Sequence, residues 1–181
     1  MTSTTIHIAA ISGSLKSTSS NTNILRAVAI LAPKNIVITI VEGLDTMPHF
    51  NPDTDENIPS VNYFRQQIKK ADAVIFSTPE YAFGVPGVLK NALDWLVSSG
   101  ELNEKPVAAI SASPLWPGGD KALASLRLTL TALGTKFTPQ SCLSIGNIKN
   151  KMNAAGTITD VATVQSLQSI LNDLIAGITS S

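Results

Sequence analysis

Apolar residues in this chain alternate between short runs typical of strands and longer stretches with helical spacing. Five apolar runs predict strands at residues 6–11, 35–41, 73–77, 107–112 and 136–145. Helical spacing predicts helices at 21–31, 60–70, 86–98, 120–133 and 160–175, the second of them with Ser60 as its cap. The chain therefore repeats one strand–helix unit along its whole length.

The predicted strands are continuous apolar runs rather than alternating ones, which is typical of strands buried on both faces. Strands that alternate with helices favour an α/β fold with a parallel sheet. The number of strands predicts a flavodoxin-like, five-stranded parallel sheet of order 2-1-3-4-5 with helices on both faces. At 181 residues, the chain has the size of one domain. We therefore expect a single domain over residues 1–181.

Charge and composition narrow the possible partners. Thirteen Lys and Arg residues balance thirteen Asp and Glu residues, so the net charge is +0. A nucleic-acid-binding protein would carry a basic excess, so no nucleic acid is expected. The segment from Met1 to Ile8 holds no Lys or Arg, and no uncharged apolar run approaches the roughly 18 residues of a membrane span. The single cysteine, Cys142, excludes an intrachain disulfide. We expect a cytoplasmic protein with no membrane partner.

Hydroxyl and amide side chains gather in the loop that follows the first predicted strand. Residues 12–23 read Ser-Gly-Ser-Leu-Lys-Ser-Thr-Ser-Ser-Asn-Thr-Asn and lead directly into a helix. A helix N-terminus offers free backbone N–H groups, and hydroxyls add further donors, so this loop suits one phosphate. It matches neither the Walker A motif nor G-x-G-x-x-G, because Gly13 stands alone. The same residues also suit a capped helix in a solvated turn.

Two further loops are expected beside it, because ligands of open parallel sheets bind at the carboxyl ends of the strands where the strand order reverses. Residues 78–87 read Thr-Pro-Glu-Tyr-Ala-Phe-Gly-Val-Pro-Gly, with two aromatic rings between prolines that restrict the backbone. Residues 113–119 read Ser-Pro-Leu-Trp-Pro-Gly-Gly. Both suit the edges of a flat ring, and both also suit rigid turns with no ligand.

Together, the three loops resemble those of the NAD(P)H-dependent FMN reductase family, whose members are FMN, quinone, azo-dye or chromate reductases. The family motif similar to G-S-L-R-x-x-S-x-N is matched by Gly13-Ser14-Leu15-Lys16, Ser19 and Asn21. The motif similar to T-P-E-Y-N-x-x-x-P-G-x-L-K-N-A-L-D-W is matched by residues 78–81, 86–87 and 89–95. Residues 111–113 and 118–119 resemble a third motif, and the match spans roughly residues 6 to 145.

The resemblance implies a role for each matching residue. It assigns the FMN phosphate to Ser14, Lys16, Ser19 and Asn21, with Thr22 through its hydroxyl. It assigns contact with the isoalloxazine and the ribityl chain to Pro79, Glu80 and Tyr81 and to the backbone of Ala82, Phe83 and Gly84. It also implies that Ser113 and Gly118 complete the pocket.

Two positions depart from the family pattern. Lys16 stands where the family usually has Arg, and a lysine lacks the bidentate fork toward phosphate. Ala82 stands where the family usually has Asn, which removes a side-chain amide beside the ring. Neither change removes a backbone contact, so cofactor binding is expected to survive.

The function implied by the resemblance is an FMN-dependent oxidoreductase. Hydride would pass from NAD(P)H through bound FMN to free flavin, a quinone or a similar small acceptor in a ping-pong cycle, with no catalytic base. The alternative is a non-enzymatic flavin-binding electron carrier or a flavodoxin-like partner-binding module. No metal is expected, because the acidic residues Asp53, Asp55 and Glu56 lack the glycine and final glutamate of a calcium loop. A hydrolase is disfavoured because no G-x-S-x-G motif is present.

Assembly is predicted from the helix at 86–98. Leu89, Ala92, Leu93 and Leu96 can face the sheet, which leaves Val88 and Trp95 on another side. That is more apolar surface than a solvent-facing helix needs. We therefore expect a homodimer or homotetramer packed through this helix, which the resemblance also implies.

Overall fold

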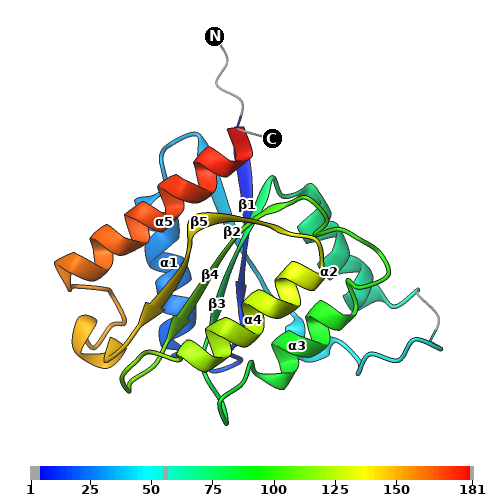
Figure 1. The fold of residues 1–181 in the computed structure, drawn as a ribbon, viewed down its shortest axis with the longest axis horizontal. Helices are drawn as coiled ribbons and strands as arrows, with labels where there is room; N and C mark the ends of the chain where they lie inside the picture. The colour runs from blue at the N-terminus through cyan, green and yellow to red at the C-terminus, as the bar shows by residue number, and fades with distance from the viewer. Residues whose placement is uncertain (1–4, 55–56, 180–181) are drawn as a thin grey trace.

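The fold is a parallel sheet between two layers of helices (Figure 1). The structure is a computed structural model that describes residues 5–54 and 57–179. The strands are β1 (Ile6–Ser12), β2 (Ile36–Val41), β3 (Ala73–Thr78), β4 (Pro106–Ala112) and β5 (Lys136–Ile145). The helices are α1 (Ser20–Leu31), α2 (Pro59–Lys70), α3 (Gly87–Asp94), α4 (Asp120–Ala132) and α5 (Val161–Thr179), with short 3-10 helices η1 (Leu44–Thr46) and η2 (Ile148–Lys151). The strand order β2-β1-β3-β4-β5, all parallel, confirms the predicted flavodoxin-like fold.

Successive strand residues send their side chains into two separate cores, one on each face of the sheet. Ile8 and Ala10 of β1 join a core with buried residues of α1 and α5. Ala9 and Ile11 of the same strand join a second core with buried residues of α2, α3 and α4. Figure 1 shows these two helical layers on opposite sides of the sheet. Burial on both faces explains why the strands are apolar without alternation.

The observed starts of α1, α2, α3 and α5 each differ by one residue from the predicted ones, and at α2 this changes the expected cap. Ser60 was expected to cap a helix, but α2 starts at Pro59, Ile58 is its N-cap, and Ser60 lies inside the first turn. Proline suits the first helical position because its missing N–H would have no partner there. At α5, by contrast, the carboxylate of Asp160 accepts hydrogen bonds from the Thr163 backbone N–H at 2.9 Å and from its hydroxyl at 2.6 Å. The hydroxyl bond, followed by the backbone bond, lowers the pKa of Asp160.

The helix predicted at 86–98 is shorter, and the two residues expected to add exposed apolar surface are covered, Val88 in part and Trp95 almost fully. α3 ends at Asp94, and Trp95 is only 2% exposed. The loop before α2 covers this indole: Trp95 Nε1 donates to the Pro48 carbonyl at 3.0 Å, and the ring meets Phe50 edge to face with centroids 5.1 Å apart. The outer side of α3 instead carries the Lys90–Asp94 ion pair. The prediction of an exposed Trp95 is therefore wrong, because a distant loop folds over it.

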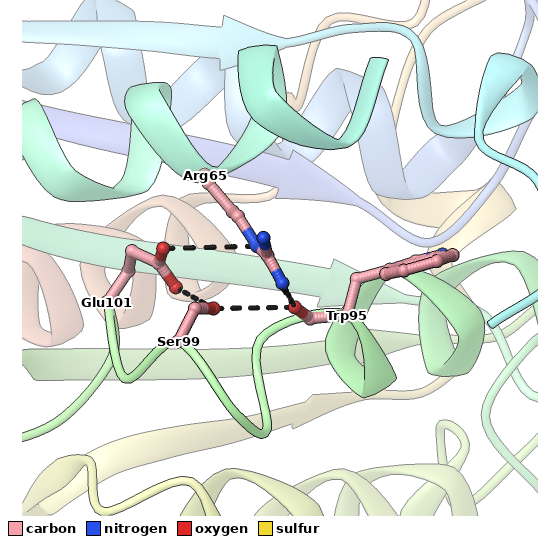
Figure 2. A network of polar contacts seen from close by, with 4 residues as sticks. All are labelled: Arg65, Trp95, Ser99 and Glu101. Atoms are coloured by element: carbon pink, nitrogen blue, oxygen red, sulfur yellow. Dashed lines mark hydrogen bonds and ion pairs between the residues drawn. The ribbon is translucent and has the colours of Figure 1, made fainter. Parts of the chain in front are cut away.

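A polar network holds the segment that follows α3 against α2 (Figure 2). Arg65 of α2 donates to the Trp95 carbonyl from Nη2 at 2.8 Å and from Nε at 3.2 Å. Its Nε also lies 4.0 Å from Oε1 of Glu101, and both side chains are about nine-tenths buried. The Ser99 hydroxyl donates to the other Glu101 oxygen at 2.5 Å. Hydrogen bonds to a charged group that is buried from water are stronger than bonds between neutral groups. This network therefore fixes the segment that follows the end of α3.

In the part of the chain that the structure describes, no helix is both long and apolar enough to cross a membrane. Cys142 lies in β5 and is half-buried.

Candidate functional site

The three loops singled out from the sequence meet at the carboxyl ends of β1, β3 and β4, which are neighbours in the sheet. A cavity of about 640 Å³ opens there. Its wall comes from the loop at 14–19, from α1, from the loops after β3 and β4, and from a segment after β5. Among the predicted site residues, the wall includes Ser14, Lys16, Ser19, Asn21, Pro79 and Tyr81.

The start of α1 forms one end of the cavity. Gly13 sits so close to β3 that an added side chain would come within 2.9 Å of Oγ1 of Thr78. Ser19 is the N-cap of α1 and accepts the backbone N–H of Thr22 at 3.4 Å. The Thr22 hydroxyl lies 2.8 Å from the hydroxyl of Ser12 and outside the cavity wall. Ser14 and Lys16 remain at the opening, beside the positive end of the helix dipole.

The buried side chain of Asn21 in α1 joins the ends of β3 and β4. Its amide oxygen accepts the Ser77 hydroxyl at 2.9 Å and the Ala112 backbone N–H at 3.2 Å. Its amide nitrogen donates to the Ala112 carbonyl at 3.1 Å. Asn21 is 3% exposed and also lines the cavity. The structure therefore gives Asn21 a positioning role, and direct contact with phosphate stays a prediction.

Other predicted residues build the loops around the cavity without lining it. The Glu80 carboxylate accepts the backbone N–H of Ala122 at 2.9 Å, so it caps the first turn of α4. Gly118 has φ +99°, and an added side chain would come within 2.6 Å of the backbone of Gly146. The Gly118 carbonyl accepts the buried Ser111 hydroxyl at 2.7 Å. Ser113 accepts the Leu115 N–H at 3.1 Å. The Glu80 contact joins the loop after β3 to the start of α4, and the other contacts fix the shape of the loop after β4.

Residues 81–84 form a tight turn at the rim of the site. Tyr81 and Gly84 exchange backbone hydrogen bonds of 3.1 and 3.0 Å. The two central residues have positive φ, +49° at Ala82 and +61° at Phe83, which is the pattern of a type I′ turn. Asn and Gly favour such turns, so Ala82 and Phe83 are strained there. Tyr81, which lines the cavity, is 57% exposed, and Phe83, which with Ala82 and Gly84 lies outside the lining, is 79% exposed.

Sequence reasoning missed one wall of the cavity. It is formed by Asn23 and Arg26 of α1, by Lys149 of η2 and by residues 152–156. Residues 153–157 form a turn, in which the Asn153 N–H donates to the Thr157 carbonyl at 2.9 Å. The available signal was topological, since the chain after β5 leaves the sheet at the same edge as the other loops.

The donor set of the cavity fits an anionic flavin nucleotide. Three cations, Lys16, Arg26 and Lys149, belong to the described wall, and no Asp or Glu does. Hydroxyls and the free N–H groups of α1 add neutral donors at one end. Tyr81, Pro79 and Pro114 supply apolar surface at the other. No group of three or more potential metal ligands occurs in residues 5–54 and 57–179, while Asp55 and Glu56 lie outside the described residues.

A hollow of similar size, about 630 Å³, lies at the opposite edge of the sheet. Its charged residues have both signs, and several are already engaged within the chain. Lys105, for example, donates to the Ala71 carbonyl at 2.5 Å. Burial lowers the pKa of Lys105, and Asp72 partly opposes this shift. This hollow therefore offers less free charge to a ligand than the cavity beside α1.

The fold and the cavity define a flavodoxin-like flavoprotein. Residues 6–150 match the family described as NADPH-dependent FMN reductase. The chain belongs to this family, as the three loops predicted, and FMN is its cofactor with NAD(P)H as co-substrate.

Relatives and solved structures agree with this assignment. The chain is 35% identical over 179 residues to an NADPH:quinone oxidoreductase of Arabidopsis thaliana, covering 94% of this chain and 91% of the relative. It is 35% identical over 159 residues to an NAD(P)H-dependent FMN reductase of Pseudomonas aeruginosa, covering 86% and 85%. The flavoenzyme FerB of Paracoccus denitrificans, an NAD(P)H:(acceptor) oxidoreductase, superposes with a TM-score of 0.84 at 28% identity over 97% of this chain and 98% of FerB.

Asn21 and Ser14 are expected to respond differently to removal of their side chains. Asn21→Ala leaves the buried Ser77 hydroxyl and the Ala112 N–H without their partner. We expect the free energy of unfolding to fall by about 2–4 kcal/mol, because each unpaired buried group costs about 1–3 kcal/mol. Ser14→Ala is expected to lower FMN affinity about tenfold while changing stability by less than about 0.5 kcal/mol. Urea unfolding and FMN fluorescence titration measure both, and an unchanged stability of Asn21→Ala would contradict the positioning role.

The strained turn at 81–84 predicts a stabilising substitution. Ala82→Asn places a residue that tolerates positive φ at a position with φ +49°. We expect the free energy of unfolding to rise by roughly 0.5–1 kcal/mol, a part of the left-handed penalty for ordinary residues. Ala82→Val is the matched control and is expected to destabilise, because β-branched residues disfavour positive φ. Equal effects of both variants in urea unfolding would argue against a strained turn.

Proposed function

We propose that this protein transfers a hydride from NAD(P)H through bound FMN to a small oxidised acceptor, either a quinone or free flavin. The observation that carries the proposal is the cavity beside α1, which joins a helix N-terminus, free cations and an apolar rim with no acidic residue in its described wall. The family match and the names of the two relatives, one a quinone reductase and one an FMN reductase, support it.

Each end of the cavity has its own task in this proposal. The N–H groups of α1, Ser14 and Lys16 hold the phosphate, while Ser19 keeps the first turn of α1 capped. Asn21 and Glu80 keep the loops after β3 and β4 in place. Pro79, Tyr81 and the turn at 82–84 border the ring, and Ser113 and Gly118 position the loop opposite.

Bound FMN supplies the redox chemistry, since a flavin accepts a hydride from a nicotinamide and passes the electrons on. The protein therefore needs no catalytic base of its own and instead provides position and shielding. Aromatic side chains at the rim, Tyr81 and Phe83, give flat apolar surface to a stacked ring. We infer that the nicotinamide and the acceptor use this rim in turn, which corresponds to ping-pong kinetics.

Turnover separates this proposal from the electron-carrier alternative. FMN-loaded protein is expected to oxidise NADPH in the presence of a quinone or of excess FMN, with parallel lines in double-reciprocal plots at several acceptor concentrations. Absorbance at the nicotinamide and flavin bands measures both reduction and turnover. Protein that binds FMN but shows no NADPH oxidation with either acceptor would favour the carrier, and intersecting lines would contradict the ping-pong cycle.

We also propose that the protein is a homodimer or homotetramer, although not through Trp95. Exposed apolar side chains gather instead on the loops beside the cavity: Leu15, Tyr81, Phe83, Leu115 and Trp116 are each more than half exposed. The loops after β3 and β4 border the same cavity through Tyr81 and Pro114. Apolar surface of this kind favours contact with a second copy.

Mass in solution checks this assembly. At micromolar concentration, light scattering is expected to give two or four times the chain mass of 19.0 kDa. The double variant Phe83→Ser and Trp116→Ser is expected to shift the mass toward one chain. Val97→Ser, which alters an exposed apolar residue just after α3, is the matched control and should leave the mass unchanged. A wild-type mass of one chain would contradict the proposal. If Val97→Ser alone lowers the mass to that of one chain, the interface lies beside α3 and not on the loops beside the cavity.

A further inference from the structure

The cavity holds more positive charge than one flavin phosphate requires. Lys16 lies in the loop that is proposed to bind this phosphate, but Arg26 and Lys149 lie on the wall that the sequence did not indicate. Neither forms an ion pair with any residue in the described part of the chain. Two uncompensated cations in a wall without acidic residues indicate a second anionic group in the ligand.

Arg26 is held in place at this wall. Its Nη1 donates to Oδ1 of Asn23, one turn earlier in α1, at 2.7 Å. Asn23 in turn packs tightly against the turn at 153–157, since an added side chain at Gly156 would come within 2.1 Å of its amide nitrogen. The guanidinium keeps further N–H groups free, and these match the geometry of a phosphate better than an ammonium does.

An apolar hollow continues from this wall. It has a volume of about 280 Å³ and shares Asn23, Arg26, Ala155 and Gly156 with the main cavity. Its other lining includes Ala27, Ile30, Ile158 and Val164 and, among the described residues, no acidic side chain. The volume is close to the lower end of small-molecule sites, which span about 300–1,000 Å³. Apolar surface beside fixed cations suits a flat heterocycle that carries a phosphate.

We propose that this hollow takes the adenine of NADPH and that Arg26, with Lys149, binds the 2′-phosphate of its ribose. The proposal deepens the proposed function and rests on it, because it assigns the adenosine half of the hydride donor. It also selects between the two donors. In Rossmann folds, sites for NADH place an acidic residue at the ribose 2′-hydroxyl and sites for NADPH place an arginine near the 2′-phosphate, and the same charge argument applies to this wall. This wall has the arginine and lacks the acid.

Nucleotide fragments test the site without turnover. In calorimetric titrations of the FMN-loaded protein, 2′,5′-ADP is expected to bind at least about tenfold more tightly than 5′-AMP, as one charge-assisted contact implies. Arg26→Gln is expected to remove this difference, and Lys149→Gln to reduce it. Lys34→Gln changes an exposed cation that lies in the turn between α1 and β2 and lines none of these cavities, so it is the matched control and should change neither affinity.

Two further readouts separate the possible ligands. Arg26→Gln is expected to raise the KM for NADPH at least about tenfold while leaving the KM for NADH and the Kd for FMN unchanged. A Kd for FMN that rises while 2′,5′-ADP affinity stays constant would show that Arg26 serves the flavin phosphate, and would overturn the proposal. Equal affinity of the wild type for 2′,5′-ADP and 5′-AMP would overturn it as well. A failure of the proposed function can be told apart from these outcomes. In that case the wild-type protein would not oxidise NADPH, while 2′,5′-ADP would still bind more tightly than 5′-AMP.

Discussion

The amide of Asn21 is the contact on which the geometry of the site depends. It is buried at the start of α1, and it joins the end of β3, through Ser77, to the end of β4, through Ala112. The ladder of hydrogen bonds between two parallel strands ends at their last paired residues. Without the Asn21 contacts, the loops that follow β3 and β4 would not be held together. Because one side chain spans both strand ends, the phosphate end and the ring end of the cavity keep a fixed relation. Glu80 extends this constraint to α4.

The net charge of the chain does not show how its charged residues are distributed. The chain has as many acidic as basic residues, and the ion pairs in its described part lie on α2, α3, α4 and the segments beside β4 and β5. The cavity beside α1 has cations without acids in its described wall. A neutral protein thus offers a local positive field to anionic ligands, and helix α1 strengthens it at one end. This arrangement suits small phosphorylated cofactors.

Patterning in the sequence was enough to predict the strand order, the five α-helices of the described residues and the edge of the sheet at which the three loops meet. Errors occurred where local signals competed. Ser60 has the chemistry of a cap, but the preceding Pro59 fits the first helical position and moves the start of α2. Trp95 has the spacing of an exposed helical residue, but the loop that carries Pro48 and Phe50 covers it. The predicted roles of Ser14, Lys16 and Tyr81 agree with their place in the cavity wall and await binding measurements.

Local sequence determined which segments form strands and helices, because hydrophobic periodicity and capping act over a few residues. It also placed the hydroxyl-rich loop at the start of α1, since both are adjacent in the chain. Contacts between distant residues required the tertiary structure. Asn21 meets Ala112 across 91 positions, and Arg26 joins Lys149 in one wall only because η2 follows the last strand at the same edge of the sheet. Such contacts depend on where individual side chains lie at the edge of the sheet, and hydrophobic periodicity specifies the order of the strands but not these positions.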